Sequence, residues 1–293
     1  MPAPLEPGDL TVVVAPSSPF ARDELWRGMA WLRTRYRVEM SGTAFARNGF
    51  LAGTDERRRA EFACAMLESQ AKAIIAARGG YGALRFAASL PWTEFARHPK
   101  WIVGFSDITA LHAMAWQTGV ASVHGPNVTG LGRSAPASVR ASWLASLERP
   151  DAVRVWRRMR CVHSGSAVVG SVVGGNLSVL HALAAAGQLR IPWGSVLMLE
   201  DAGEAPYRVD RMLTSLILGG HLRGAAAIVF GSLDQRTAPH GGPSSDDVLA
   251  ERTASLGVPV LSGAPFGHGE VNEAFVLGAS AAVIGNELHL NGD

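Results

Sequence analysis

The chain has 293 residues, of which 47% are hydrophobic and 18% charged, a globular composition without the signature of disorder. Its 27 basic and 25 acidic side chains are interspersed and leave a net charge of +2, so no basic stripe predicts nucleic-acid binding. This length allows one large or two medium domains, each with a substantial core.

Strands and helices alternate in the first part of the chain. Apolar runs predict strands and amphipathic stretches predict helices, in the order strand 10–15, helix 22–35, strand 36–40, helix 54–70, strand 72–78, a helix after the turn at 79–82, strand 101–105 and helix 108–116. Such alternation predicts a parallel, doubly wound α/β sheet. In these sheets the functional site lies at the carboxyl ends of the strands.

The pattern changes after about residue 130 and becomes strand-rich. We expect strands at 166–173, 196–200 and 225–230, helices at 177–186 and 207–218, and a mobile loop at 239–245. Residues 133–150 are polar and interrupted by proline, which is typical of a linker. The sequence therefore predicts an N-terminal α/β domain over 1–135, a linker region over 136–165, and a β-rich α+β domain over 166–293.

Cysteine content and the N-terminal segment indicate the compartment. Cys64 and Cys161 lie far apart and form no CxxC motif, so we expect two reduced, partly buried thiols. The first basic residue is Arg22 and the apolar run before it is short, unlike a signal peptide. No segment reaches membrane-spanning length. A cytoplasmic protein that does not bind membranes is the expectation.

Ser106 follows the strand at 101–105 and precedes a helix, as a nucleophile on a sharp turn would. The first N–H groups of a helix lack intrahelical partners and can bind an oxyanion. However, Ile108 stands where the GxSxG elbow of α/β-hydrolases has its second glycine. A plain helix N-cap is an equally good interpretation of Ser106 from the local sequence.

The segment Arg78-Gly79-Gly80-Tyr81-Gly82 forms a glycine-rich turn after another strand. It could bind a phosphate or a carboxylate, or lend a backbone N–H to an oxyanion hole. It lacks the Lys-Ser/Thr of a P-loop and contains no GxGxxG, which disfavours nucleotide binding. A turn that only requires positive φ is the structural alternative. We favour a turn whose amide also serves the site.

Glu200 ends an apolar strand and could orient an imidazole, although a solvent-facing acid is the commoner fate of such a residue. His268 stands between two glycines that allow close approach to another group. His124, in a loop near a strand end, is a second-rank candidate. The histidines inside helical patterns, His112 and His181 among them, are predicted to be structural. No HExxH motif or paired Cys/His spacing supports a metal site.

These strings together resemble the LD-carboxypeptidase family of serine peptidases, which includes the murein tetrapeptide carboxypeptidases and the microcin-immunity peptidases. The resemblance rests on seven segments that occur in the family's order over nearly the whole chain, namely 50–55 (FLAGTD), 77–82 (ARGGYG), 104–111 (GFSDITAL), 124–126 (HGP), 174–177 (GGNL), 199–213 (LED with EAPYRVDRML) and 267–268 (GH). It implies a Rossmann-like N-terminal domain that carries the serine and a smaller β-rich domain with the Glu and His.

The resemblance also implies a role for each matching residue. The Ser-His-Glu triad falls on Ser106, His268 and Glu200. The oxyanion hole falls on the backbone N–H groups of Gly80 and Asp107. The family needs no cofactor and usually forms homodimers.

The substrate implied by the resemblance is a recycled murein tetrapeptide that loses its terminal D-Ala. Its carboxylates and amine would suit paired basic and acidic groups, for which Arg78, Glu204 and Arg208 are candidates. Surface ion pairs are the structural alternative for Arg208. A peptidase for an aminoacyl-nucleotide antibiotic is the functional alternative within the family. A non-catalytic binder is disfavoured because all three triad positions are filled.

Overall fold

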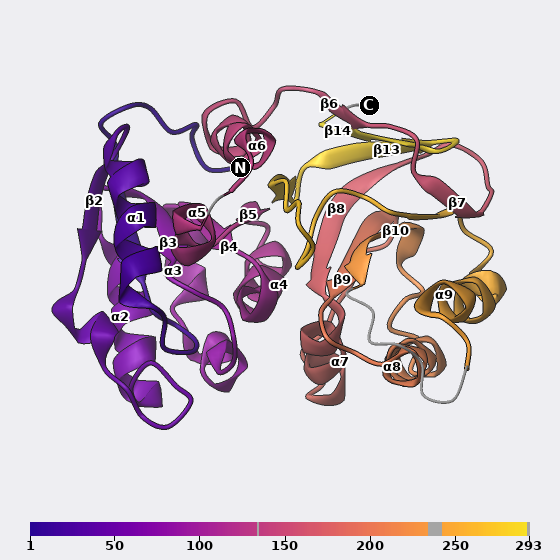
Figure 1. Cartoon of the computed structure of the whole chain (residues 1–293), viewed down its shortest axis with the longest axis horizontal. Coiled ribbons are helices and arrows are strands. Elements are labelled where there is room, and N and C mark those ends of the chain that lie inside the picture. The colour runs from indigo at the N-terminus through magenta and orange to yellow at the C-terminus, as the bar shows by residue number, and fades with distance from the viewer. Residues whose placement is uncertain (134, 234–241, 292–293) are drawn as a thin grey trace. The chain divides into compact units, whose positions relative to one another are not determined.

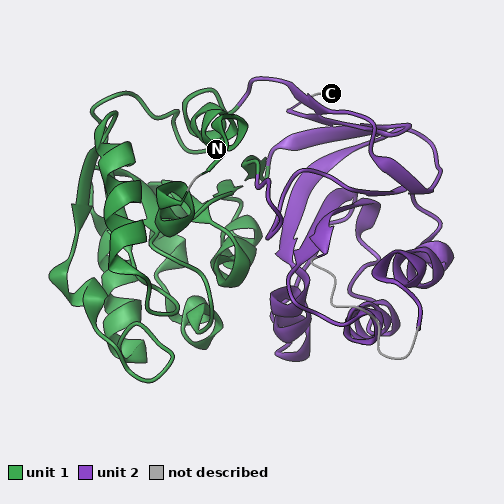
Figure 2. Ribbon diagram, viewed as in Figure 1, with its two compact units in different colours: residues 1–150, 273–278 green, residues 151–272, 279–293 purple. Residues whose placement is uncertain are grey.

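The computed structural model describes residues 1–133, 135–233 and 242–291. The chain folds into two compact units, shown in Figure 2. Unit 1 comprises residues 1–150 and 273–278, and unit 2 comprises residues 151–272 and 279–293. None of the described helices combines the length and apolar composition that crossing a bilayer requires.

Unit 1 is built on a six-stranded sheet with the order β12-β5-β4-β3-β1-β2. The strands are β1 (Leu10–Val14), β2 (Arg37–Met40), β3 (Ala71–Ala76), β4 (Trp101–Gly104), β5 (Ser122–His124) and β12 (Phe275–Leu277). All neighbouring strands are parallel except β12, which pairs antiparallel with β5. The predicted doubly wound α/β class is confirmed.

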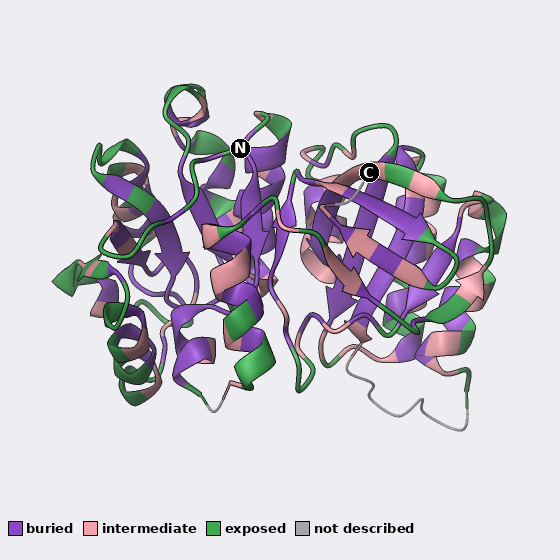
Figure 3. Cartoon of the chain, turned by 90° about the horizontal axis from the view of Figure 1, so that it is seen from above, coloured by how far each residue is buried: buried purple, intermediate pink, exposed green. Residues whose placement is uncertain are grey.

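The apolar runs of β1, β3 and β4 are buried almost throughout, as Figure 3 shows by colour. Such continuous burial is typical of parallel strands that are covered on both faces. The helices of this unit are α1 (Arg22–Arg33), α2 (Asp55–Leu67), α3 (Trp92–Arg97), α4 (Thr109–Gln117), α5 (Val128–Gly132) and α6 (Ala137–Glu148), labelled in Figure 1.

Unit 2 contains an eight-stranded sheet with the order β6-β14-β13-β8-β9-β10-β11-β7. The strands are β6 (Arg154–Trp156), β7 (Arg160–His163), β8 (Val168–Asn176), β9 (Ser195–Asp201), β10 (Ala225–Leu233), β11 (Val260–Ser262), β13 (Ser280–Ile284) and β14 (Glu287–Leu290). Strands β8 to β11 are parallel, and the outer pairs are antiparallel. The helices are α7 (Leu177–Ala185), α8 (Pro206–Leu218) and α9 (Ser245–Thr253).

Several local expectations need correction. Residues 136–165, expected as a linker, carry α6, β6 and β7 instead. Helix α6 buries Val139, Trp143 and Leu147 on one face, a four-residue spacing that the neighbouring prolines and arginines obscured. Cys64 and Cys161 are free thiols but are exposed rather than partly buried. Part of the loop expected at 239–245 lies outside the described residues.

Helices α1 and α5 approach so closely that glycine is required at their contact. A Cβ added at Gly28 would lie 2.0 Å from the carbonyl oxygen of Val128, and one at Gly132 would lie 1.8 Å from that of Glu24. The obstructing atoms are backbone, which cannot rotate out of the way as a side chain can. The packing of the two helices therefore depends on the absence of side chains at these positions.

We expect Gly28→Ala to lower the free energy of unfolding by about 2–3 kcal/mol through overpacking, although alanine gains about 1 kcal/mol in helix propensity. Gly42→Ala is the matched control, because a Cβ there meets nothing within 4 Å, and it should stay within about 0.5 kcal/mol of wild type. Urea denaturation measures both. Equal stability of the two variants would contradict the packing argument.

Candidate functional site

The chain turns sharply after β4, and Ser106 lies at the corner. The short 3-10 helix Ser106–Ile108 begins there and leads into α4. Ser106 has φ 65°, a left-handed conformation that L-residues adopt at a cost of about 1–2 kcal/mol. Its side chain is therefore presented at the carboxyl end of β4, where parallel sheets place their sites.

The glycine loop, residues 79–82, follows β3 and lies against this turn. A Cβ on Gly79 would lie 2.9 Å from the Cβ of Ser106, so glycine permits the contact. Gly80 has φ 108°, and a Cβ there would lie 2.4 Å from the Oγ of Ser18. The Asp107 N–H belongs to the first helical turn, where backbone donors lack an intrahelical acceptor. The two predicted oxyanion donors thus belong to two loops that lie side by side in unit 1.

The loop after β1 supports the glycine loop through several hydrogen bonds. The Ser18 N–H donates to the carbonyl of Gly79 at 3.2 Å, and the Tyr81 N–H donates to Ser18 Oγ at 3.1 Å. Arg78 donates to the carbonyl of Pro19 at 2.6 Å. The predicted substrate residue Arg78 therefore also has a structural partner.

The side chain of Asp107 is buried and accepts hydrogen bonds from Ser17 Oγ at 2.6 Å and from the Ala83 N–H at 2.8 Å. Burial raises the pKa of the Asp107 carboxyl, while hydrogen bonds from Ser17, Ala83 and Gly82 and the charge of Arg58 act in the opposite direction. Sequence analysis considered only the backbone of Asp107. Its position next to Ser106 gave no indication of a partner 90 residues away.

In unit 2, Glu200 and His268 are brought together. Glu200 lies near the end of β9 with its side chain fully buried, and its Oε2 is 2.7 Å from Nδ1 of His268. The His268 side chain is 26% exposed. A carboxylate on Nδ1 holds the proton there and leaves Nε2 as the basic nitrogen. The imidazole is thus set in the tautomer that a general base requires.

Glycine before His268 makes this pair possible. Gly267 has φ 104°, and a Cβ there would lie 2.8 Å from Oε2 of Glu200. The neighbouring Asp201 instead accepts hydrogen bonds from Asn176 and Ser178 at the start of α7. Of these adjacent acids, Glu200 is hydrogen-bonded to the imidazole and Asp201 to the residues that begin α7.

The other predicted substrate residues in unit 2 form an ion pair on the surface. Arg208 lies 3.4 Å from Glu204 and also contacts the ring hydroxyl of Tyr207. The Arg208 side chain is 55% exposed, so this pair contributes little to stability. A role in binding substrate stays a prediction.

His112 and His124 are fully buried beside the strand that carries the nucleophile turn. His112 bonds Ser122 Oγ at 2.8 Å and the carbonyl of Gly104 at 2.9 Å, so it ties α4 to β4 and β5. His124 stacks on Phe275 of β12. The contacts of His112 fit the structural role predicted for it, whereas a functional role for His124 stays a prediction.

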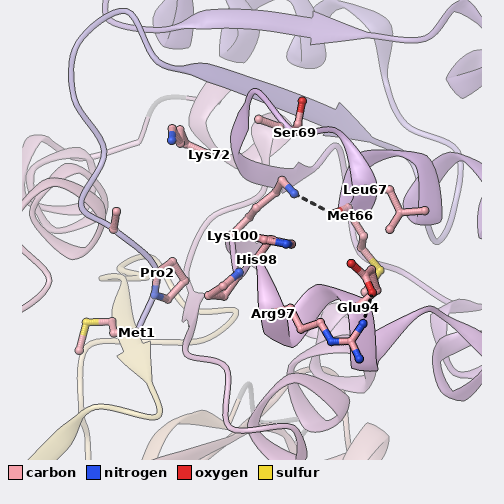
Figure 4. Close-up of a pocket in the computed structure, with 13 residues that line it drawn as sticks. Met1, Pro2, Met66, Leu67, Ser69, Lys72, Glu94, Arg97, His98 and Lys100 are labelled. Carbon is pink, nitrogen blue, oxygen red and sulfur yellow. Dashed lines mark hydrogen bonds and ion pairs between the residues drawn. The ribbon is translucent and has the colours of Figure 1, made fainter.

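A pocket of about 510 Å³ lies near the amino ends of β3 and β4 in unit 1, at the other end of these strands from Ser106 and the glycine loop (Figure 4). Lys100 in this pocket donates to the carbonyl of Met66 in the last turn of α2, and Arg97 pairs with Glu94. Lys100, Arg97 and Glu94 are thus engaged in local structure. Within the described ranges, no group of three or more His, Cys, Asp or Glu side chains is arranged to hold a metal ion.

The fold is that of a two-unit α/β protein with a largely parallel sheet in unit 1. The sequence pattern of the LD-carboxypeptidase N-terminal domain matches residues 12–125, and that of the C-terminal domain matches residues 169–283. The chain belongs to the LD-carboxypeptidase family, as the motifs predicted.

Individual relatives agree with this assignment. The murein tetrapeptide carboxypeptidase of Pseudomonas aeruginosa is 34% identical, and the match covers 94% of this chain and 93% of that protein. The crystal structure of muramoyltetrapeptide carboxypeptidase from Oxalobacter formigenes has a TM-score of 0.87 and 27% identity, covering 97% of this chain and 99% of that one. The microcin C7 self-immunity protein of Escherichia coli is 24% identical over 96% of this chain and 92% of its own length.

The left-handed backbone at Ser106 has a consequence for stability. We expect the free energy of unfolding of Ser106→Gly to be about 0.5–1 kcal/mol higher than that of Ser106→Ala, because only glycine adopts this φ without strain. Arg158, exposed and at φ 59°, supplies the control pair Arg158→Gly and Arg158→Ala, which should show a similar difference. Urea denaturation checks this, and an Ala variant as stable as its Gly counterpart at position 106 would argue against strain there.

Burial lowers the pKa of His112 to about 4 from its ordinary 6.5. As the pH falls, His112 therefore binds a proton near pH 6.5 in the unfolded chain but only near pH 4 in the folded protein. Stability contributed by neutral His112 is full above pH 6.5 and falls by up to about 3 kcal/mol as the pH drops through this window.

The measurement is the free energy of unfolding at several pH values between 7 and 4.5. In the variant His112→Gln we expect a shallower decline than in wild type. An equally steep decline in the variant would show that other groups cause the acid sensitivity.

Proposed function

We propose that this protein is a serine-type LD-carboxypeptidase that releases the terminal D-Ala from murein tetrapeptides. Ser106 is the nucleophile, His268 the general base and Glu200 the group that orients the imidazole. The observation that carries the proposal is the fully buried Glu200 carboxylate on Nδ1 of His268 at 2.7 Å. A relative named for this activity, at 34% identity over most of the chain, supports the choice of substrate.

The reaction proceeds through an acyl-enzyme. Nε2 of His268 takes the proton of the Ser106 hydroxyl as Oγ attacks the carbonyl carbon of the L,D amide bond. The backbone N–H groups of Gly80 and Asp107 hold the oxyanion. The imidazolium then gives its proton to the departing amine of D-Ala. A water molecule, deprotonated by the same imidazole, hydrolyses the ester and restores Ser106.

The oxyanion donors, Glu200 and the substrate-binding side chains have different roles in the reaction. One oxyanion donor stabilises the transition state by roughly 3–4 kcal/mol. Glu200 stabilises the imidazolium that forms during attack, and its burial strengthens this electrostatic effect. Arg78, Glu204 and Arg208 are proposed to bind the carboxylates and amine of the peptide, where charge-assisted hydrogen bonds are strong.

Compartment and assembly are part of the same proposal. The substrate is a recycled murein peptide, so we propose that the protein acts in the cytoplasm, and we expect a homodimer, as the family resemblance implies. Sedimentation of the purified chain checks the second point.

The central test is the release of D-Ala from a murein tetrapeptide. Wild-type protein should release it from the tetrapeptide but not from the pentapeptide, whose terminal bond is D,D. Ser106→Ala should lower kcat by at least about 10³-fold, and Glu200→Gln by roughly 10³- to 10⁴-fold through loss of the correct tautomer. Asp151→Asn, which removes an exposed carboxylate of unit 2, is the control and should keep full activity.

The same assay separates the rival substrate class. An aminoacyl-nucleotide conjugate offered in parallel should remain intact. Cleavage of the conjugate alone would replace the murein substrate by the antibiotic while leaving the triad in place. Unchanged hydrolysis by Ser106→Ala in a clean preparation would remove the triad assignment.

A further inference from the structure

One buried carboxylate connects three loops of unit 1. Asp107 Oδ2 accepts from Ser17 Oγ in the loop after β1 and from the N–H of Ala83 at the end of the glycine loop, and Asp107 itself belongs to the turn after β4. Strands β4, β3 and β1 are neighbours in the sheet, so their following loops meet at one edge. We call Asp107, Ser17 and the Ala83 N–H the carboxylate brace.

The brace joins the two loops that carry the predicted oxyanion donors. Hydrogen bonds that hold the Asp107 side chain also restrict the backbone of its turn, to which the Asp107 N–H belongs. The hydrogen bond to Ala83 holds the end of the loop that contains Gly80. The two donors must point at a single oxygen atom to act together.

Burying this carboxylate is costly, which argues that it is kept for a reason. A carboxylate out of water is destabilising unless it is hydrogen-bonded and paired with a charge. Arg58 supplies a nearby positive charge, while its own ion pair is with Asp55. Its guanidinium is fully buried, contacts the carbonyl of Pro16 and lies next to Gly82, where an added Cβ would be 2.6 Å from Nη1. The opposite charges are thus both enclosed beneath the nucleophile turn.

We propose that the Asp107 side chain is a positioning residue of the reaction, which aligns the backbone donors of Gly80 and Asp107 toward the oxyanion by tying the Ser106 turn and the glycine loop to Ser17. This inference rests on the proposed function. It assigns to the Asp107 carboxylate a role apart from that of its own backbone N–H.

Positioning predicts a particular kinetic pattern. Donors that act on the oxyanion stabilise the transition state and hardly affect the bound substrate, so kcat should fall while KM stays nearly constant. Asp107→Asn keeps one oxygen that can accept from Ser17 and Ala83, whereas Asp107→Ala keeps none. We expect kcat to fall by about 10-fold in the Asn variant and about 10²- to 10³-fold in the Ala variant. Ser17→Ala, which removes one hydrogen bond of the brace, should lower kcat by less than Asp107→Ala does.

The test that does not depend on the substrate is labelling by a fluorophosphonate, which forms a covalent bond with an activated serine and releases fluoride. Both the rate and the final amount of label per chain are measured. Slower labelling that still reaches about one label per chain indicates misaligned donors. Wild-type protein and Ser106→Ala define the full and the zero signal.

Glu148→Gln is the matched control. Glu148 also accepts hydrogen bonds from two side chains, Arg35 and Tyr36, but it lies in α6, away from the carboxyl ends of the strands. It should be labelled at the wild-type rate. Urea denaturation of all variants shows that each is folded at the temperature of the assay.

The outcomes separate the two proposals. Asp107→Ala labelled at the wild-type rate, or labelled to a lower final amount at an unchanged rate, would overturn the positioning role and leave the triad intact. Failure of the wild-type protein to label at Ser106 would overturn the proposed function and the positioning role together. A raised KM with constant kcat would also overturn positioning, because it would indicate loss of substrate binding.

Discussion

The left-handed backbone at Ser106 is the constraint on which the proposed nucleophile turn of unit 1 depends. It ends β4, starts the next helix and brings the serine against Gly79, where an added Cβ would lie 2.9 Å from that of Ser106. Strain of this kind persists only where surrounding contacts determine the conformation. The Asp107 side chain next to Ser106 is held by hydrogen bonds from Ser17 and Ala83, which restrict the same turn.

The Glu200–His268 pair in unit 2 follows a different physical logic. Glu200 is enclosed by the sheet and by Gly267, so its charge is held in a medium where it acts strongly on His268. The histidine remains partly exposed. Burial of the acid and exposure of the imidazole suit the proposed division of this pair into an orienting group and a general base.

Local patterns predicted the fold of unit 1 and the turn at Ser106, because strand periodicity and glycine placement are short-range properties. The pairing of β12 with β5 could not be predicted, since it joins Phe275 to His124 across most of the chain. The roles of Glu200 and His268 came from the family resemblance rather than from spacing. The bond between Asp107 and Ser17 was missed for the same reason as β12, because no local signal marks a distant partner.

Ile108 explains why the common GxSxG pattern is absent although the turn is present. The glycine before the serine is needed, since a Cβ on Gly104 would lie 2.7 Å from Oδ1 of Asn127 and 2.8 Å from Cγ1 of Ile108. The second position after the serine can hold a larger side chain, because Ile108 there is fully buried and its side chain packs against Gly104. The second glycine of the usual elbow is thus replaced by an isoleucine that fills the space left by the first.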